Sequence, residues 1–146
     1  MVGVEKYLLD TNVIIEVLRG NDDMITKIES VGQSNCYISE ITLAELLYGA
    51  VRSNNPKNFH DVECIEQEFH VLSIRPAYRQ YAETRNLLRQ KGMPIDHMDL
   101  FVASVAMYNN LTLVSHNTKH FVRINILKYC CPVKTGFGSF VLKQIH

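Results

Sequence analysis

The stretch Tyr7-Leu8-Leu9-Asp10-Thr11-Asn12 decides how the rest of the chain is read, because an apolar run ends there in a carboxylate and passes directly into a helical pattern. The run is continuous rather than alternating, which is typical of a short strand buried on both faces. Apolar residues then recur at helical spacing until Gly20. A buried strand, a carboxylate able to cap a helix, and a helix together predict the opening unit of an α/β fold.

Short apolar runs alternate with helical patterns along the remaining chain. Further strands are expected at 36–38, 71–74 and 111–114. Helices are expected from Asp22 or Asp23 to 31, over 41–51, over 59–69, from Pro76 to about 91, and from Asp96 or Asp99 to 107. A short helical turn is expected over 119–123. We expect 59–69 to return against 41–51 as a helical hairpin. Strands alternating with helices predict a parallel sheet covered on both faces, and such sheets place their sites at the carboxyl ends of the strands.

The segment 128–146 is less regular than the rest of the chain. Strand-like pieces are expected at 129–133 and 140–142, around a turn at Gly136-Phe137-Gly138. All 146 residues are expected to form a single domain, 1–146, because 47% of them are hydrophobic and no internal repeat or low-complexity segment interrupts them.

The charge balance excludes attraction to nucleic acid by the molecule as a whole. Fifteen Lys and Arg offset fifteen Asp and Glu, so the formal net charge is zero. Any contact with nucleic acid must therefore be local. If several carboxylates gather in one site, the remaining surface is correspondingly more basic, with candidate cations at Arg52, Lys57, Arg85, Arg89, Lys91, Lys119 and Arg123.

The chain shows neither a leader pattern nor a membrane span. Its first residues lack a basic region followed by a long apolar stretch, and no window approaches the run of about 20 apolar residues that a membrane helix requires. We expect a cytoplasmic protein with no membrane association. The four cysteines form no Cys-x-x-Cys pair, so we expect reduced thiols, mostly in the core: Cys36, Cys64, Cys130 and Cys131.

Four side chains with oxygen donors fall where apolar segments end. Asp10 ends the first strand and Asn117 lies just beyond the fourth, so both are expected on the carboxyl edge of the sheet. Asp99 follows Asp96 by three positions, which places them on one helix face, and Glu45 lies one turn into its own helix. Carboxylates that crowd together repel one another, so a site that keeps three ionised implies a cation. Oxygen ligands without thiolates select Mg²⁺ or Mn²⁺ rather than zinc.

Each of these residues also has an ordinary structural interpretation. Asp10 fits a helix cap, Thr42-x-x-Glu45 matches a capping box, Asp99 is favoured by the helix dipole, and Asn117 suits a turn. His116 and His120 stand at helical spacing, but surface or capping roles are more typical of such a pair than metal binding. The convergence of four such residues on one edge is the argument for a site.

The same stretches resemble the PIN-domain ribonucleases, in particular the VapC-type toxins of bacterial toxin–antitoxin pairs. The order and spacing of four motifs are kept from Leu8 to Ile124. The motifs are Leu8-Leu9-Asp10-Thr11-Asn12, Ser39-x-Ile41-Thr42-x-x-Glu45-Leu46-x-x-Gly49-Ala50, Ile95-x-x-x-Asp99-x-x-Val102-Ala103-x-x-Ala106 and Leu113-Val114-Ser115-x-Asn117-x-x-x-Phe121-x-Arg123-Ile124.

The resemblance implies a PIN-like three-layer α/β/α domain with a central parallel sheet of four to five strands. It implies that Asp10, Glu45 and Asp99 are acidic metal ligands and that Asn117 fills a fourth position that is often Asp in the family. The neutral amide lowers the charge of the site, so one firmly held ion is expected. Asp96 is expected to be an accessory ligand or a helix cap. The family also implies a homodimer and a complex with a small antitoxin.

The resulting hypothesis is an endoribonuclease that hydrolyses an RNA phosphodiester with a water activated by Mg²⁺ or Mn²⁺. Alternatives are a PIN-like RNA-processing nuclease without an antitoxin and a catalytically weak module that binds RNA or a partner. A phosphatase that uses Asp10 as nucleophile is disfavoured, since such enzymes usually carry a second Asp where Asn12 stands. The C-terminus departs from the family pattern, because relatives commonly end soon after Ile124, often with a Trp, and this chain has no Trp.

Overall fold

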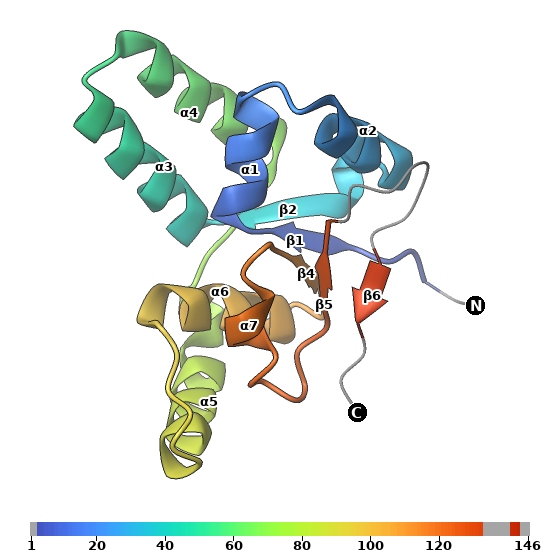
Figure 1. Cartoon of the computed structure of the whole chain (residues 1–146), viewed down its shortest axis with the longest axis vertical. Helices are drawn as coiled ribbons and strands as arrows, with labels where there is room; N and C mark the ends of the chain where they lie inside the picture. Colours follow the sequence, from blue (N-terminus) through green and yellow to red (C-terminus); the bar gives the residue numbers. More distant parts are fainter. Residues whose placement is uncertain (1–2, 133–140, 144–146) are drawn as a thin grey trace.

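The computed structural model describes residues 3–132 and 141–143, which form a six-stranded sheet with helices on both faces (Figure 1). The strands are β1 (Tyr7–Leu9), β2 (Cys36–Ser39), β3 (His70–Leu72), β4 (Thr112–Val114), β5 (Tyr129–Cys131) and β6 (Val141–Lys143). Their order is β3-β2-β1-β4-β5-β6; neighbours from β3 to β5 run parallel, and β6 pairs antiparallel with β5. The predicted parallel sheet is confirmed, with one antiparallel strand added at its edge.

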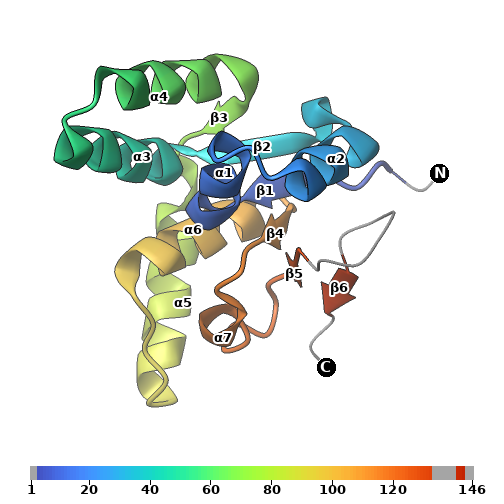
Figure 2. The ribbon, with the colours of Figure 1, turned by 45° about the horizontal axis from the view of Figure 1, so that its top comes forward.

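Helices fill the two outer layers. They are α1 (Thr11–Leu18), α2 (Asp22–Val31), α3 (Glu40–Ser53), α4 (Pro56–Glu68), α5 (Tyr78–Gln90), α6 (His97–Tyr108) and α7 (Thr118–Phe121), with short 3₁₀ turns at Gln33–Asn35 and Arg75–Ala77. Helices α1 to α4 cover one face of the sheet and α5 to α7 the other (Figures 1 and 2). This is the three-layer α/β/α arrangement that the sequence predicts.

The continuous apolar strands supply both cores at once. Leu8 and Leu113 pack among the residues of α5, α6 and α7, whereas Leu9 and Val114 pack among those of α1, α2 and α4. All four side chains are fully buried. Because successive side chains of a strand point to opposite faces, a strand covered on both sides needs apolar residues at every position.

Polar side chains fix where three helices begin. Asp10 caps α1 by accepting from the backbone N–H of Thr11, and Asp96 caps α6. Ser39 caps α3 by accepting from the backbone N–H of Thr42. The capping-box interpretation of Thr42-x-x-Glu45 is therefore wrong, because the helix starts three residues earlier. The Glu45 carboxylate lies in the second turn and is not needed for a cap.

The α3–α4 hairpin and α5 extend from the two faces of the sheet (Figures 1 and 2). The predicted hairpin is confirmed. Helical spacing predicts that four α3 side chains face inward: Leu43, Leu46, Leu47 and Ala50. Leu46 and Ala50 are buried as predicted and Leu43 is half-buried, but the prediction is wrong for Leu47, which is 47% exposed; Tyr48 and Val51 on the same helix are more exposed still.

The C-terminal strands are β5 and β6, close to the predicted positions, and the expected turn at Gly136-Phe137-Gly138 lies outside the described residues. All four cysteines are free; Cys36 and Cys130 lie in the core as predicted, whereas Cys64 and Cys131 are half-buried. Within the part of the chain that the structure describes, no helix has both the length and the apolar character to cross a bilayer.

Candidate functional site

The carboxyl edge of β1 and β4 carries the acidic residues singled out above. Asp10 directly follows β1, and its backbone N–H donates to the carbonyl of Val114, the last residue of β4, at 2.9 Å. Ser115 and Asn117 then lead from β4 into α7, while α3 and α6 bring Glu45 and Asp99 to the same edge. Four elements distant in sequence thus contribute to one region.

Asp10 is the buried member of the group, with 5% of its surface exposed. One carboxylate oxygen accepts from the Thr11 backbone N–H at 2.8 Å, and the other accepts from the Ser115 hydroxyl at 2.7 Å. Burial raises the pKa of the Asp10 carboxyl; these hydrogen bonds oppose the shift, and the charge of Asp99 adds to it. The ionised form of Asp10 is therefore destabilised unless a cation approaches it.

The Ser115 hydroxyl links the two strands that form this edge. It donates to Asp10 and accepts both from the Asn12 side-chain amide at 3.2 Å and from the backbone N–H of Asn117 at 3.0 Å. The Asn12 carbonyl oxygen in turn accepts from the backbone N–H of His116 at 3.2 Å. A single buried hydroxyl with all its hydrogen-bonding capacity used thus fixes the Asp10 carboxylate against the start of α7.

Glu45 is held from α1. The Thr11 hydroxyl donates to Glu45 Oε1 at 2.8 Å and lies 3.2 Å from the hydroxyl of Thr42. Partial burial is the main cause that raises the pKa of Glu45, and repulsion from Asp10, Asp99 and Asp96 raises it further. Because the charges of all three aspartates act on Glu45, the four acidic groups share one electrostatic environment.

Asp99 is more accessible than Asp10, with 20% of its side chain exposed. Its Oδ2 accepts from the Asn117 amide at 2.8 Å and lies 2.6 Å from His120 Nδ1. His120 therefore contacts a carboxylate of the site and is more than a surface or capping residue. His116 is exposed, as expected, and meets Glu16 at 2.8 Å, so the two rings do not form the metal pair that the sequence disfavoured.

Asp96 caps α6, with its Oδ1 accepting from the backbone N–H groups of Met98 and Asp99. It nevertheless contributes to the repulsion at Glu45. The capping interpretation of Asp10 and Asp96 is thus confirmed, and both caps still belong to the acidic region.

Three polar residues of the region were not identified from the sequence. Thr11, Asn12 and Thr42 hold carboxylates or their supporting hydroxyl, as described above. Thr11 and Asn12 directly follow Asp10, so their position beside the strand end was the available signal. Nothing local in the sequence shows that Thr11 reaches a carboxylate 34 positions away.

The donor set suits a hard divalent cation. In residues 3–132, no Lys or Arg forms an ion pair with any of the four carboxylates. Within the described residues, no three Asp, Glu, His or Cys side chains lie close enough together to hold a metal ion by themselves. Mg²⁺ is commonly held by one or two carboxylates and several waters, so this open arrangement of oxygen donors fits it, whereas structural zinc needs four close ligands rich in nitrogen and sulfur.

Comparison with known proteins gives an independent result. The family model described as "PIN domain" matches residues 7–127. The chain is 33% identical over 129 residues to "Ribonuclease VapC1" of Haemophilus influenzae (strain R2866), covering 84% of this chain and 95% of that protein. It is 30% identical over 125 residues to "tRNA(fMet)-specific endonuclease VapC" of Shigella flexneri, with the same coverage.

A solved structure shares the fold over most of its length. It is that of VapBC2 from Rickettsia felis bound to a DNA fragment from the promoter. The TM-score is 0.79 and the sequence identity 32%, with 86% of this chain and 97% of that chain covered.

Proposed function

The chain belongs to the PIN domain family, and from that membership and its acidic edge we propose that it is a metal-dependent endoribonuclease. One observation carries the proposal: four carboxylates, from α3, the start of α6 and the end of β1, lie in one region. There the pKa values of Asp10 and Glu45 are raised, and no Lys or Arg of residues 3–132 pairs with them. A cation at this edge relieves that repulsion.

Asp10 and Asp99 would hold Mg²⁺ or Mn²⁺, and Glu45 would ligate the ion or position the attacking water. Asp96 is a possible accessory ligand. When bound, the ion supplies an activated water and offsets negative charge on the phosphate under attack. Asn117 orients Asp99, because its amide donates to Asp99 Oδ2 and leaves Oδ1 for other partners.

The side chains around the carboxylates set their geometry and proton affinity. Thr11 occupies Glu45 Oε1, so Oε2 is the atom available to take a proton from water. The raised pKa of Glu45 makes it a stronger base than an ordinary glutamate, which favours proton transfer. Ser115 keeps Asp10 Oδ2 in place, so the buried carboxylate does not reorient during turnover.

A small antitoxin is the proposed partner. The neighbour from Rickettsia felis is a VapBC2 complex, and α3 exposes apolar side chains that suit contact with a protein, either an antitoxin or a second copy in a homodimer: Leu47, Tyr48 and Val51. The alternative is a PIN-like RNA-processing nuclease without an antitoxin. A small upstream reading frame encoding a DNA-binding N-terminus favours the toxin, and its absence favours processing.

A second candidate is a binding module with weak catalysis, which the neutral Asn117 favours because it lowers the charge available to hold an ion. The aspartyl-phosphate route is disfavoured because Asn12 stands where such phosphatases usually carry a second Asp.

The test uses end-labelled initiator transfer RNA, chosen because the Shigella relative is specific for tRNA(fMet), with ribosomal and messenger RNA in parallel. We expect discrete internal fragments with Mg²⁺ or Mn²⁺ and none with EDTA. Calorimetric titration with Mn²⁺ should show binding that Asp99→Asn weakens. Cleavage that continues at full rate in EDTA contradicts the metal role; Mn²⁺ binding without cleavage of any RNA favours the module.

A further inference from the structure

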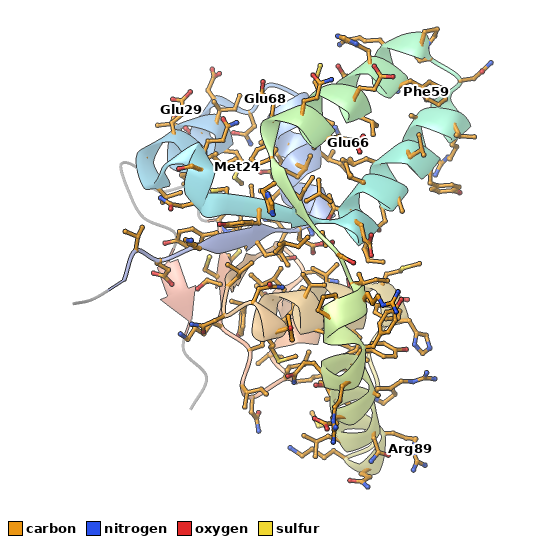
Figure 3. The ribbon with its side chains drawn as sticks, turned by 180° about the vertical axis from the view of Figure 1, so that it is seen from behind. Met24, Glu29, Phe59, Glu66, Glu68 and Arg89 are labelled. Carbon is orange, nitrogen blue, oxygen red and sulfur yellow. The ribbon has the colours of Figure 1, made fainter. Side chains whose placement is uncertain are left out.

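The charges of this neutral molecule are separated between its two helical extensions. Between Arg75 and Lys91 five of six charged side chains are cationic, whereas between Pro56 and Phe69 four of five are acidic. The first segment contains α5 and the second is α4 with its following residue. Figure 3 shows Arg89 at the far end of α5 and Glu66 on α4, on opposite sides of the sheet. The segment that contains α5 therefore carries a net positive charge, although the net charge of the whole chain is zero.

Arg85 is fixed on a rigid support in the middle of α5. Its Nη1 donates to the hydroxyl of Tyr81 at 3.2 Å, and its guanidinium carbon lies 6.0 Å from the centre of the Tyr81 ring. That ring stacks on Phe101 of α6, with centroids 4.0 Å apart and planes inclined by 5°. Arg89 follows Arg85 by four positions and so lies on the same helix face.

The same tyrosine connects Arg85 to the start of α6. The Tyr81 hydroxyl lies 2.9 Å from His97 Nδ1. That hydroxyl also accepts from Arg85, so it joins the guanidinium to the exposed imidazole of His97. His97 directly follows Asp96 in the acidic region. Hydrogen-bond donors thus run from Arg89 along α5 to the edge that carries Asp99.

We infer that Arg89, Arg85 and His97 form a docking track for the phosphates of a single RNA strand beside the acidic site, an inference that rests on the proposed function. An acidic edge repels a polyanion, so RNA must gain compensating contacts next to it. Guanidinium and imidazole N–H groups suit phosphate oxygens. Phe101 and Arg85 lie against the Tyr81 ring, so this ring is poorly placed to stack on a base. We therefore expect binding along the track to be independent of the RNA sequence.

An acidic protein segment is the other polyanion that the basic face of α5 could bind. RNA is favoured because the track leads to the carboxylates that act on RNA in the proposed reaction. Exposed apolar side chains lie on both helices, Leu47, Tyr48 and Val51 on α3 and Tyr78 and Leu87 on α5, so the choice of RNA rests on charge and on the position of the carboxylates.

The test measures the affinity of the full chain for labelled oligouridine and oligoadenosine RNA in EDTA by fluorescence anisotropy. Arg85→Gln and Arg89→Gln should each weaken binding about three- to tenfold for both RNAs and lower the slope of log affinity against log salt by about 0.7. Arg79→Gln is the matched control, because Arg79 lies on the same helix but pairs with Glu83 at 2.9 Å. Its affinity should stay within about twofold of the unmodified chain.

Tyr81→Phe keeps the ring on Phe101 but removes the hydroxyl between Arg85 and His97, so a smaller loss is expected, equal for both RNAs. Polyglutamate serves as the acidic-peptide probe for the same variants. Four results overturn the inference: the unmodified chain does not bind RNA at low salt, Arg85→Gln and Arg89→Gln keep full RNA affinity, Arg79→Gln loses as much RNA affinity as they do, or Arg85→Gln and Arg89→Gln lose polyglutamate binding while RNA binding stays intact. Binding in EDTA needs no cleavage, so a failure of the proposed reaction is observed separately.

Discussion

The Asp10 side and the Asp99 side of the acidic edge hold equivalent groups in different ways. Asp10 is 5% exposed and its oxygens accept from neutral donors, the Thr11 backbone and the Ser115 hydroxyl. Asp99 is only half-buried and faces Asn117 and His120. The difference shows that one carboxylate is fixed by the fold, with its charge penalised, while the other lies where solvent and substrate reach it.

The largest expected effect comes from neutralising the two sides separately. Asp10→Asn and Asp99→Asn should each lower RNA cleavage by about a thousandfold or more, because each removes a proposed ligand charge. Their effects on metal-free stability should differ in sign. Asp10→Asn removes a buried charge and should raise Tm, whereas Asp99→Asn removes the partner of His120 and should lower it.

Thermal unfolding in EDTA and cleavage in Mg²⁺ measure the two effects independently. If both substitutions shift Tm in the same direction, the distinction between a buried and an accessible side is incorrect. A variant with full cleavage removes that aspartate from the mechanism.

A smaller but still large effect is expected at the hydroxyl that joins the two sides. Ser115→Ala removes the donor to Asp10 and leaves the Asn117 backbone N–H without its acceptor, at a cost of about 1–3 kcal/mol in stability. Cleavage should fall about 10- to 100-fold, as for other residues that orient metal ligands. Ser115→Thr keeps the hydroxyl and should retain activity. Equal loss in both variants indicates a packing effect instead.

The Asp99 side should be more tolerant of losing its neighbour. His120→Ala leaves Asn117 on Asp99 and should weaken Mn²⁺ binding about tenfold, measured by calorimetry. His116→Ala is the matched control, because the His116 ring pairs with Glu16 on α1 and, within the described residues, makes no hydrogen bond to Asp99 or Asn117. A loss in the control as large as that in His120→Ala contradicts a specific role for His120.

The smallest expected effect is the pH dependence of the metal-free chain. A carboxyl group whose pKa is higher in the folded than in the unfolded state binds its proton more tightly when the chain is folded. At pH values below its unfolded pKa it therefore stabilises the folded state. This contribution is lost as the pH rises through the folded pKa. For Asp10 the window starts near its ordinary value of 3.8 and extends upward. The Tm advantage of Asp10→Asn over the unmodified chain should therefore grow with pH in EDTA and shrink when Mg²⁺ is added. An advantage that is constant across this window excludes burial of charge as its cause.

Much of the acidic edge followed from the sequence alone. The strand ending at Asp10 and the fourth strand before Asn117 are short-range patterns, and parallel strands bring their carboxyl ends together. The start of α6 near Asp99 likewise follows from a local cap and an apolar run. Glu45 was harder, because a capping box with Thr42 explained it equally well until the structure showed Ser39 as the cap.

The histidines show where sequence reasoning fails. The four-residue spacing of His116 and His120 fits a pair of metal ligands and a pair of surface residues equally well. Only the path of the chain through α7 turns His120 onto Asp99 and His116 onto Glu16. The same holds for Leu47, whose helical position suits either the core or the surface until α4 is placed beside it.

The sequence by itself determined which segments become strands and helices and which ends of those elements carry carboxylates, because periodicity and capping act over a few residues. The tertiary structure alone decided the partners of those groups: Ser115 with Asp10, Thr11 with Glu45, and His120 with Asp99. These contacts join residues 21 to 105 positions apart, and their distances depend on how all layers pack together, which no local pattern encodes.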